Sequence, residues 1–260
     1  MRLIHLGDIH MYRLAASPLH LLGKPLLGQV NLWLSRRRRF DLSLAPQVVK
    51  RIVELKPDRV LLSGDLTTTA QANEFADAAR VLTPLEPYAP YLVPGNHDVY
   101  TYTAARQDLV RRYFPDWLPS RFSDLQTLGG RWHLLGLNSA VPRWLSSRGR
   151  VGEQQLTAAR QQFASLEPDQ GVVVVNHYAL AKPPSMSAMH WDHRLADRDA
   201  LLALLADCKA RVLYLHGHVH RPWVWRREEP GMTHITDINA GSPKMTASEY
   251  PHGQAFRDII

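Results

Sequence analysis

The sequence predicts an α/β protein, and three observations support this fold class. Short apolar runs alternate along the chain with longer segments that have the apolar periodicity of amphipathic helices. Residues 171–175 contain four consecutive valines, which is typical of a strand buried on both faces. The chain shows no internal repeat and no low-complexity linker, so we expect a single domain over residues 1–260.

The apolar runs give the strands, some of which end at residues that break extended structure. The run at 91–93, for example, is followed by Pro94 and Gly95. We expect strands at residues 2–7, 59–63, 91–93, 132–137, 171–175, 211–215, 234–239 and 255–260.

The helical segments repeat apolar residues with the spacing of one helix face. The segment 46–56 begins with Pro46, which suits the first turn of a helix, and Pro57 ends it. We expect helices at residues 46–56, 70–82, 103–113, 152–166 and 197–207.

The composition excludes several classes of protein. Hydrophobic residues make up 45% and charged residues 21% of the chain, which excludes a disordered or fibrous protein. The single cysteine, Cys208, excludes an internal disulfide and leaves too few thiols for a cysteine-based zinc site. No apolar stretch reaches the ~18 residues of a membrane-spanning helix, and Arg2 interrupts any signal-peptide pattern, so we expect a cytoplasmic protein.

Two further numbers indicate the kind of partner. The formal net charge of +7 favours an anionic partner such as a phosphate compound, a nucleic acid or an acidic membrane surface. Part of this excess lies in the arginine run at 36–39, which is also compatible with a solvated surface. The 13 histidines matter because several lie close in sequence to Asp or Asn.

Polar side chains follow five of the predicted strands at the point where each strand ends. In an open α/β sheet, ligands bind outside the carboxyl ends of the strands, so these groups can meet in one crevice. The groups are Asp8 and His10; Asp65; Asn96, His97 and Asp98; His177; and His216, His218 and His220.

The types and spacing of these residues indicate metal binding. Asp8 and His10 alternate along the chain, so on an extended backbone they would face the same ion. His218 and His220, on a turn, could be divided between two ions. Oxygen and imidazole ligands together suit Mn²⁺, Fe²⁺, Zn²⁺ or Co²⁺ rather than a soft metal.

In this order, the segments D-x-H, G-D, G-N-H-D, N-H and G-H-x-H resemble the calcineurin-like metallophosphoesterase family. The resemblance extends from Asp8 to residues 239–242, which covers most of the chain. It implies a four-layer α/β/β/α sandwich with two divalent metal ions, for which we expect Mn²⁺. By this resemblance the first ion is bound by Asp8, His10, Asp65 and His220, and the second by Asn96, His177, His218 and the bridging Asp65.

The resemblance also implies the catalytic groups. His97 would give a proton or a hydrogen bond to the leaving-group oxygen, and Asp98 would orient and polarise His97. A hydroxide that bridges the two metals would attack phosphorus in line. The sequence departs from the family pattern at Asn176, where many relatives have a second histidine before His177. His216 is left outside the metal ligands, with the alternative that it holds a ligand imidazole by a hydrogen bond.

The segment 11–41 is a hydrophobic and basic insert after the first metal motif. Leucines and Trp33 recur in it at helical spacing and are followed by the arginine run at 36–39. Residues 18–40 could therefore lie on an anionic membrane surface, which would make the protein peripheral on the inner membrane face. A helix packed against the domain, with solvated arginines, is equally compatible with this pattern.

These observations predict a phosphohydrolase that cleaves a phosphoester or a phosphoanhydride. Its motifs and its hydrophobic insert are somewhat similar to those of bacterial UDP-2,3-diacylglucosamine hydrolases, although one branch of that activity carries Arg where His97 stands. The alternatives are a cyclic-nucleotide or other phosphodiesterase, a nuclease and a non-catalytic metal-binding scaffold. Nucleic acid ranks lower, because leucines crowd the insert where a phosphate-binding groove needs polar side chains.

The loop 181–195 follows His177 directly and could overhang the site. It contains His190, Trp191 and His193. The candidates for phosphate or sugar contacts near this loop are Lys182, Arg143, Arg148 and Arg194. Each of these side chains is also compatible with an ordinary surface position.

Overall fold

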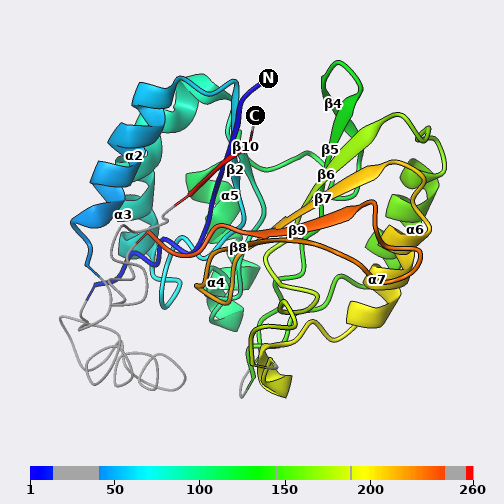
Figure 1. Ribbon diagram of the computed structural model, residues 1–260. Coiled ribbons are helices and arrows are strands. Elements are labelled where there is room, and N and C mark those ends of the chain that lie inside the picture. Colours follow the sequence, from blue (N-terminus) through cyan, green and yellow to red (C-terminus); the bar gives the residue numbers. More distant parts are fainter. Residues whose placement is uncertain (14–40, 144–145, 188, 244–255, 260) are drawn as a thin grey trace.

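A computed structural model describes residues 1–13, 41–143, 146–187, 189–243 and 256–259. Two β-sheets pack face to face, and helices cover the outer face of each sheet (Figure 1). The expected four-layer α/β/β/α arrangement is therefore confirmed. The predicted insert, apart from its two ends, falls outside the described residues, and so does the membrane prediction for residues 18–40.

The first sheet carries the N-terminal half of the polar groups. It consists of β1 (Leu3–Leu6), β2 (Arg59–Leu62), β3 (Tyr91–Leu92) and β10 (Arg257–Ile259), in the order β10-β1-β2-β3. β1, β2 and β3 run parallel, whereas β10 pairs antiparallel with β1. The helices α2 (Leu44–Leu55) and α3 (Ala72–Leu82) pack on its outer face, and the 3-10 helix η3 (Thr83–Tyr88) follows α3.

The second sheet carries the C-terminal half. It consists of β4 (Gln126–Gly129), β5 (Trp132–Gly136), β6 (Gly171–Val175), β7 (Arg211–His216), β9 (Ile235–Asn239) and β8 (Trp223–Arg226), in that spatial order. β5, β6, β7 and β9 run parallel, and the edge strands β4 and β8 are antiparallel to their neighbours. The helices α6 (Glu153–Phe163) and α7 (Arg198–Ala206) cover its outer face.

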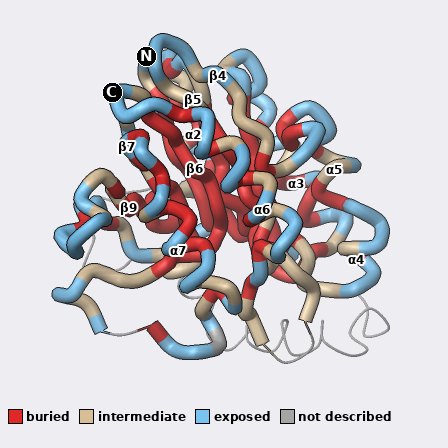
Figure 2. The backbone as a smooth tube through the Cα atoms, turned by 90° about the vertical axis from the view of Figure 1, so that its right-hand side faces the viewer, coloured by how far each residue is buried: buried red, intermediate tan, exposed pale blue. Residues whose placement is uncertain are grey.

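The inner faces of the two sheets form the central core. Leu3 and Leu61 from the first sheet lie in one buried cluster with Val173 and Leu215 from the second sheet. Figure 2 shows the strands of the second sheet as a buried layer beneath more exposed helices and loops. Because both sheets are anchored in this core, their strand ends keep a fixed relative position.

The predicted helix at 103–113 is wrong as a single element. The chain instead forms α4 (Tyr102–Arg106) and α5 (Leu109–Tyr113), separated by Gln107 and Asp108. Asp108 has a left-handed backbone with φ 45°, and its side chain accepts a hydrogen bond from the Arg111 amide, which caps α5. The apolar spacing of this segment gives no sign of the break, because the buried residues of both short helices belong to the same apolar cluster.

The two edge strands β4 and β8 were not predicted. β4 has alternating intermediate and exposed residues, and β8 contains the exposed Val224 between Trp223 and Trp225. Such short edge strands lack the continuous apolar signal of central strands.

Among the described residues, no helix combines the length and the apolar character needed to cross a membrane.

A buried histidine lies in β1, beneath the edge where the polar groups gather. His5 is fully buried, and its Nε2 lies 3.0 Å from Ser63 Oγ. Burial lowers the pKa of His5 to about 3, and the neighbouring His216 and Arg257 act in the same direction. The folded protein therefore keeps this imidazole neutral at pH values where an unfolded chain would protonate it.

We expect His5 to make the protein less stable in mild acid. Below the ordinary imidazole pKa of ~6.5, the unfolded chain binds a proton that the folded chain does not, so the free energy of unfolding falls with pH until about 3. Urea unfolding at about pH 6.5 and about pH 5 should show that the wild type loses about 1.5 kcal/mol more than the His5→Asn variant. If the free energy of unfolding fell by the same amount between the two pH values in both proteins, this interpretation would be contradicted. A difference in stability that is the same at both pH values does not bear on it.

Candidate metal centre

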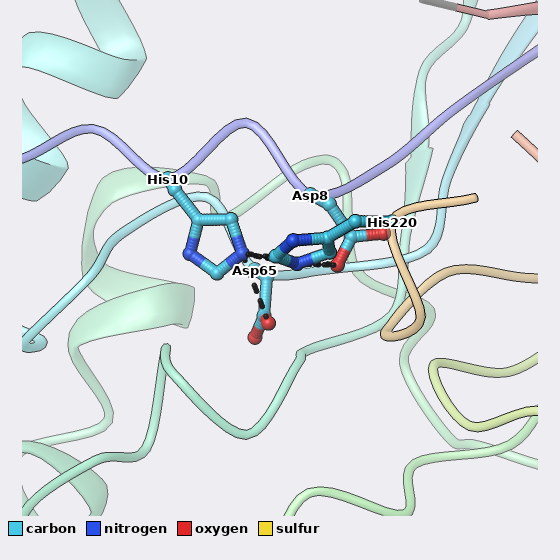
Figure 3. A group of neighbouring side chains, drawn as sticks. All are labelled: Asp8, His10, Asp65 and His220. Atoms are coloured by element: carbon cyan, nitrogen blue, oxygen red, sulfur yellow. Dashed lines mark hydrogen bonds and ion pairs between the residues drawn. The ribbon is translucent and has the colours of Figure 1, made fainter. Parts of the chain in front are cut away.

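The first group of candidate ligands gathers four of the predicted residues. Asp8, His10, Asp65 and His220 place one ligand atom each within 4.8 Å of one another (Figure 3). His10 Nε2 lies 2.9 Å from His220 Nε2 and 3.5 Å from Asp65 Oδ2. His220 Nε2 lies 3.3 Å from Asp8 Oδ1. The ends of β1, β2 and β7 therefore meet at one point.

The second group shares Asp65 with the first. Asp65, His177 and His218 also place their ligand atoms within 4.8 Å of one another. The amide oxygen of Asn96 joins them, because it lies 3.0 Å from His177 Nε2 and 2.9 Å from His218 Nδ1. All seven residues predicted as metal ligands are thus brought together, in the two predicted sets, with Asp65 common to both.

The donor set fits two divalent cations. The imidazole nitrogens of His10 and His220 are 2.9 Å apart, a pair that can share only one proton, whereas both lone pairs can bind one cation. The carboxylates of Asp8 and Asp65 are fully or almost fully buried and face these imidazoles. Buried carboxylates of this kind require a compensating positive charge. Oxygen and imidazole donors are the ligands of the borderline divalent metals.

The backbone brings these side chains together in a different way from the one expected. Asp8 and His10 were expected to share a face because of an extended chain, but both have a left-handed backbone, with φ of 54° and 50°. Asp65, His218 and His220 are left-handed as well. Such conformations cost free energy and concentrate at functional sites, so the tight turns at the strand ends, rather than strand alternation, aim the ligands inward.

Two glycines allow the strand-end loops to approach the carboxylates closely. A β-carbon at Gly95 would lie 2.2 Å from Asp65 Oδ1, and one at Gly217 would lie 2.1 Å from Asp8 Oδ2. Neither glycine has a positive φ, so space rather than backbone conformation requires it. Any larger residue would push the loop away from the carboxylate that it surrounds.

Hydrogen bonds to the backbone orient the candidate ligands. His177 Nδ1 lies 2.7 Å from the Ser63 carbonyl, which leaves Nε2 facing the second group. The amide of His218 donates to both oxygens of Asp8, at 3.0 and 2.9 Å. The amide of His97 donates to Asp65 Oδ1 at 2.8 Å. These contacts fix ligand orientation in the manner typical of metal sites.

The charges in this centre strongly influence one another. Burial alone would raise the pKa of Asp65, but the imidazoles of His177, His97 and His10 hold that pKa well below its ordinary value. Burial alone would lower the pKa of His177, but the carboxylates of Asp65 and Asp8 raise that pKa to about 9. The centre therefore keeps Asp65 anionic and favours positive charge beside it.

His97 lies beside the first group, outside the candidate ligands. Its ring makes an edge contact with His10, with 4.9 Å between ring centroids, and stacks on Tyr100 at 5.6 Å with an interplanar angle of 5°. Its Nδ1 lies 2.6 Å from the Thr68 carbonyl. Sequence reasoning missed Thr68 and Tyr100, because neither belongs to a ligand motif.

The expected role of Asp98 is corrected by its contacts. Asp98 was expected to orient and polarise His97, but its Oδ1 accepts from the Thr67 amide at 3.0 Å and from Thr67 Oγ1 at 3.2 Å. Its Oδ2 accepts from the Gly95 amide at 2.9 Å. Burial raises the pKa of Asp98 to about 7, and the nearby Asp65 carboxylate adds to this effect. Asp98 therefore holds the loops together, and the Thr68 carbonyl orients His97.

His216 lies outside both ligand groups and anchors the end of β7. It is fully buried, and its Nε2 lies 2.5 Å from Asp237 Oδ1. Asp237 also accepts from Arg227 Nη2 at 3.0 Å and from Trp223 Nε1 at 3.2 Å. The sequence motifs gave no sign of this network, which joins β7, β9 and β8 directly behind the turn that carries His218.

The predicted phosphate-contacting residues occupy different positions. Arg194 donates through Nε and Nη2 to the Met189 carbonyl, at 3.0 and 2.8 Å, so it holds its own loop. Arg143 Nε donates to the carbonyl of Arg148 at 2.9 Å, and both side chains are half-buried. Lys182 is also half-buried, in the loop after His177. Their contact with a substrate stays a prediction.

The departure at Asn176 has a structural explanation. Its side-chain oxygen accepts hydrogen bonds from Ser139 Oγ and from the Tyr178 amide. The residue is fully buried and ties the loop after β5 to the end of β6. Asn176 therefore supports the position of His177, and its side-chain oxygen is engaged by Ser139 and Tyr178.

Comparisons with known proteins agree with this geometry. The sequence model of a family described as calcineurin-like phosphoesterase matches residues 1–222. The structure is similar to a dimetal phosphatase from Danio rerio, with a TM-score of 0.67 at 13% identity, covering 99% of this chain and 91% of that one.

Two further solved structures share the fold. A phosphopantetheinyl hydrolase from Mycobacterium tuberculosis has a TM-score of 0.54 at 15% identity, covering 99% of this chain and 95% of that one. A purple acid phosphatase from yellow lupin has a TM-score of 0.55 at 15% identity, covering 94% of this chain and 44% of that one. A comparison with curated proteins gives no match. At these identities the structural similarities show the fold alone.

We expect the Asp98→Asn variant to lose stability. An amide nitrogen cannot accept a hydrogen bond, so either Thr67 or the Gly95 amide loses its buried acceptor. The free energy of unfolding, measured with urea, should fall by about 1–3 kcal/mol. Asp116→Asn, at an exposed aspartate, is the matched control and should change it little. A fully stable Asp98→Asn variant would show that the carboxylate does not hold these loops.

Proposed function

Because the chain belongs to the calcineurin-like phosphoesterase family, we propose that it hydrolyses a phosphoester or a phosphoanhydride with two divalent metal ions. The observation that carries this proposal is the pair of ligand groups that share the buried Asp65. A carboxylate common to two groups is the arrangement that holds two cations side by side.

The proposed ligand sets follow the two groups. One cation would be held by Asp8, His10, Asp65 and His220, and the other by Asp65, Asn96, His177 and His218. Bound there, two divalent cations would activate a water molecule as the nucleophile and neutralise charge on the phosphoryl oxygens. We propose Mn²⁺ as the metal, with Fe²⁺, Zn²⁺ and Co²⁺ as alternatives that suit the same donors.

We propose that His97 assists the leaving group. Its ring lies against the ligand His10 rather than within either ligand group. With Nδ1 donating its proton to the Thr68 carbonyl, the orientation of the ring is set, and Nε2 can donate to an oxygen when the ring carries its second proton as an imidazolium. We therefore assign His97 the role of hydrogen-bond or proton donor to the departing oxygen.

The substrate proposal depends on the segment after the first ligands. An amphiphilic substrate at a membrane surface, such as UDP-2,3-diacylglucosamine, is favoured by the hydrophobic and basic sequence at 18–40. Cyclic nucleotides or other phosphodiesters are the alternative. A cytoplasmic location with peripheral binding to an anionic membrane belongs to the same proposal, because it depends on the same residues.

Removal of a shared or paired ligand should abolish metal-dependent hydrolysis. Asp65→Ala and His218→Ala should lower kcat/KM for bis-p-nitrophenyl phosphate with Mn²⁺ by about 10³-fold or more, because the charge that stabilises the transition state is lost. Asp116→Ala, at an exposed aspartate, is the control and should keep wild-type activity. Unchanged turnover by either ligand variant would refute the proposed centre.

The role of His97 predicts a dependence on the leaving group. For an alkyl phosphoester that the wild type hydrolyses, His97→Gln should reduce kcat by about 10²-fold or more, because an alkoxide needs a proton to depart. For p-nitrophenyl esters, whose leaving group is stable as an anion, the loss should stay below about tenfold. Equal losses for both kinds of substrate would exclude His97 as the donor.

A further inference from the structure

A second histidine that is not a candidate ligand lies against the centre. It contacts the second ligand group, whereas His97 contacts the first. The ring centroid of His193 is 5.4 Å from that of His218, with an interplanar angle of 50°. His218 Nδ1 faces Asn96 and His177 in the second ligand group. His193 is exposed and does not belong to either group of converging ligand atoms among the described residues.

The loop that carries His193 is firmly anchored. His193 ends the 3-10 helix η4 (Trp191–His193), directly before Arg194. The Arg194 guanidinium donates twice to the Met189 carbonyl, which closes the loop on itself. Met189 is buried in an apolar cluster with Trp223 of β8. These contacts fix the backbone on both sides of His193, so its position beside His218 is part of the folded structure.

A second loop also contacts His193. Ser147 Oγ lies 3.4 Å from His193 Nδ1, and the Ser147 carbonyl accepts a hydrogen bond from the Tyr178 hydroxyl. The ring of Tyr178 also packs on His218, with 4.4 Å between centroids. The rings of His193 and Tyr178 thus both pack against the ring of His218.

We propose that His193 donates a hydrogen bond to a non-bridging phosphate oxygen of the substrate and so is a substrate-binding residue. The inference rests on the proposed function, because it requires a phosphate at the metal centre. An imidazole N–H is a strong donor to an anionic oxygen, and an exposed side chain beside a ligand ring is accessible to a bound substrate. The two non-ligand histidines then have separate tasks: His97 serves the leaving group beside His10, and His193 holds the phosphate beside His218.

The test compares His193→Ala and His193→Gln with His190→Ala, a control at an exposed histidine of the same loop. Steady-state kinetics with Mn²⁺ and bis-p-nitrophenyl phosphate give kcat and KM, and calorimetry gives the Kd values of inorganic phosphate and of Mn²⁺. For His193→Ala we expect KM and the phosphate Kd to rise about tenfold or more, with an unchanged Kd for Mn²⁺. His193→Gln, which keeps an N–H donor, should recover part of the loss, and His190→Ala should stay within about twofold of the wild type.

Two results would overturn the inference. KM and phosphate Kd within about twofold of the wild type would show that His193 does not contact the phosphate. A raised Kd for Mn²⁺ in both His193 variants would show that the ring supports the ligand His218 instead. A wild type that binds phosphate through His193 but hydrolyses no phosphoester would count against the proposed function alone, because phosphate binding is measured separately from turnover.

Discussion

The buried carboxylate of Asp65 is the constraint on which the rest of the centre depends. It is 1% exposed, faces His10 in one ligand group and His177 in the other, and accepts a hydrogen bond from the His97 amide. A buried anion is costly unless positive charge compensates it, and imidazoles alone do this only by taking up protons. Two divalent cations bound here would neutralise the carboxylates and would leave the imidazoles neutral as ligands. The fold therefore holds the Asp65 carboxylate in a buried position between the two ligand groups.

The two-sheet core offsets the free-energy cost of the strained backbone conformations at the ligands. Each ligand lies just beyond a strand end, where left-handed residues such as Asp8 and His220 would be unstable in a free peptide. Apolar packing between the sheets and the buried network of His216, Asp237 and Arg227 hold the turns in place. Glycines complete the arrangement where a backbone must lie directly on a carboxylate. Packing and hydrogen bonds outside the centre thus hold the ligands in fixed positions.

The sequence predicted the strands other than β4 and β8, their order along the chain and the gathering of the seven ligands, because the ligand motifs follow apolar runs. It could not predict contacts made by the backbone. The backbone carbonyl of Thr68 orients His97, and a backbone carbonyl has no sequence signature. The break at Asp108 depends on a local left-handed cap within an uninterrupted apolar pattern. The position of His193 depends on the packing of Met189 against Trp223 across a long loop, and the sequence shows only that the histidine is present.

The most direct test of the shared centre is a crystal structure of the protein loaded with Mn²⁺, with anomalous scattering used to locate the ions. We expect two anomalous peaks, one surrounded by Asp8, His10 and His220 and the other by Asn96, His177 and His218, with an oxygen of Asp65 in contact with both. A single peak, or ions bound away from Asp65, would contradict it.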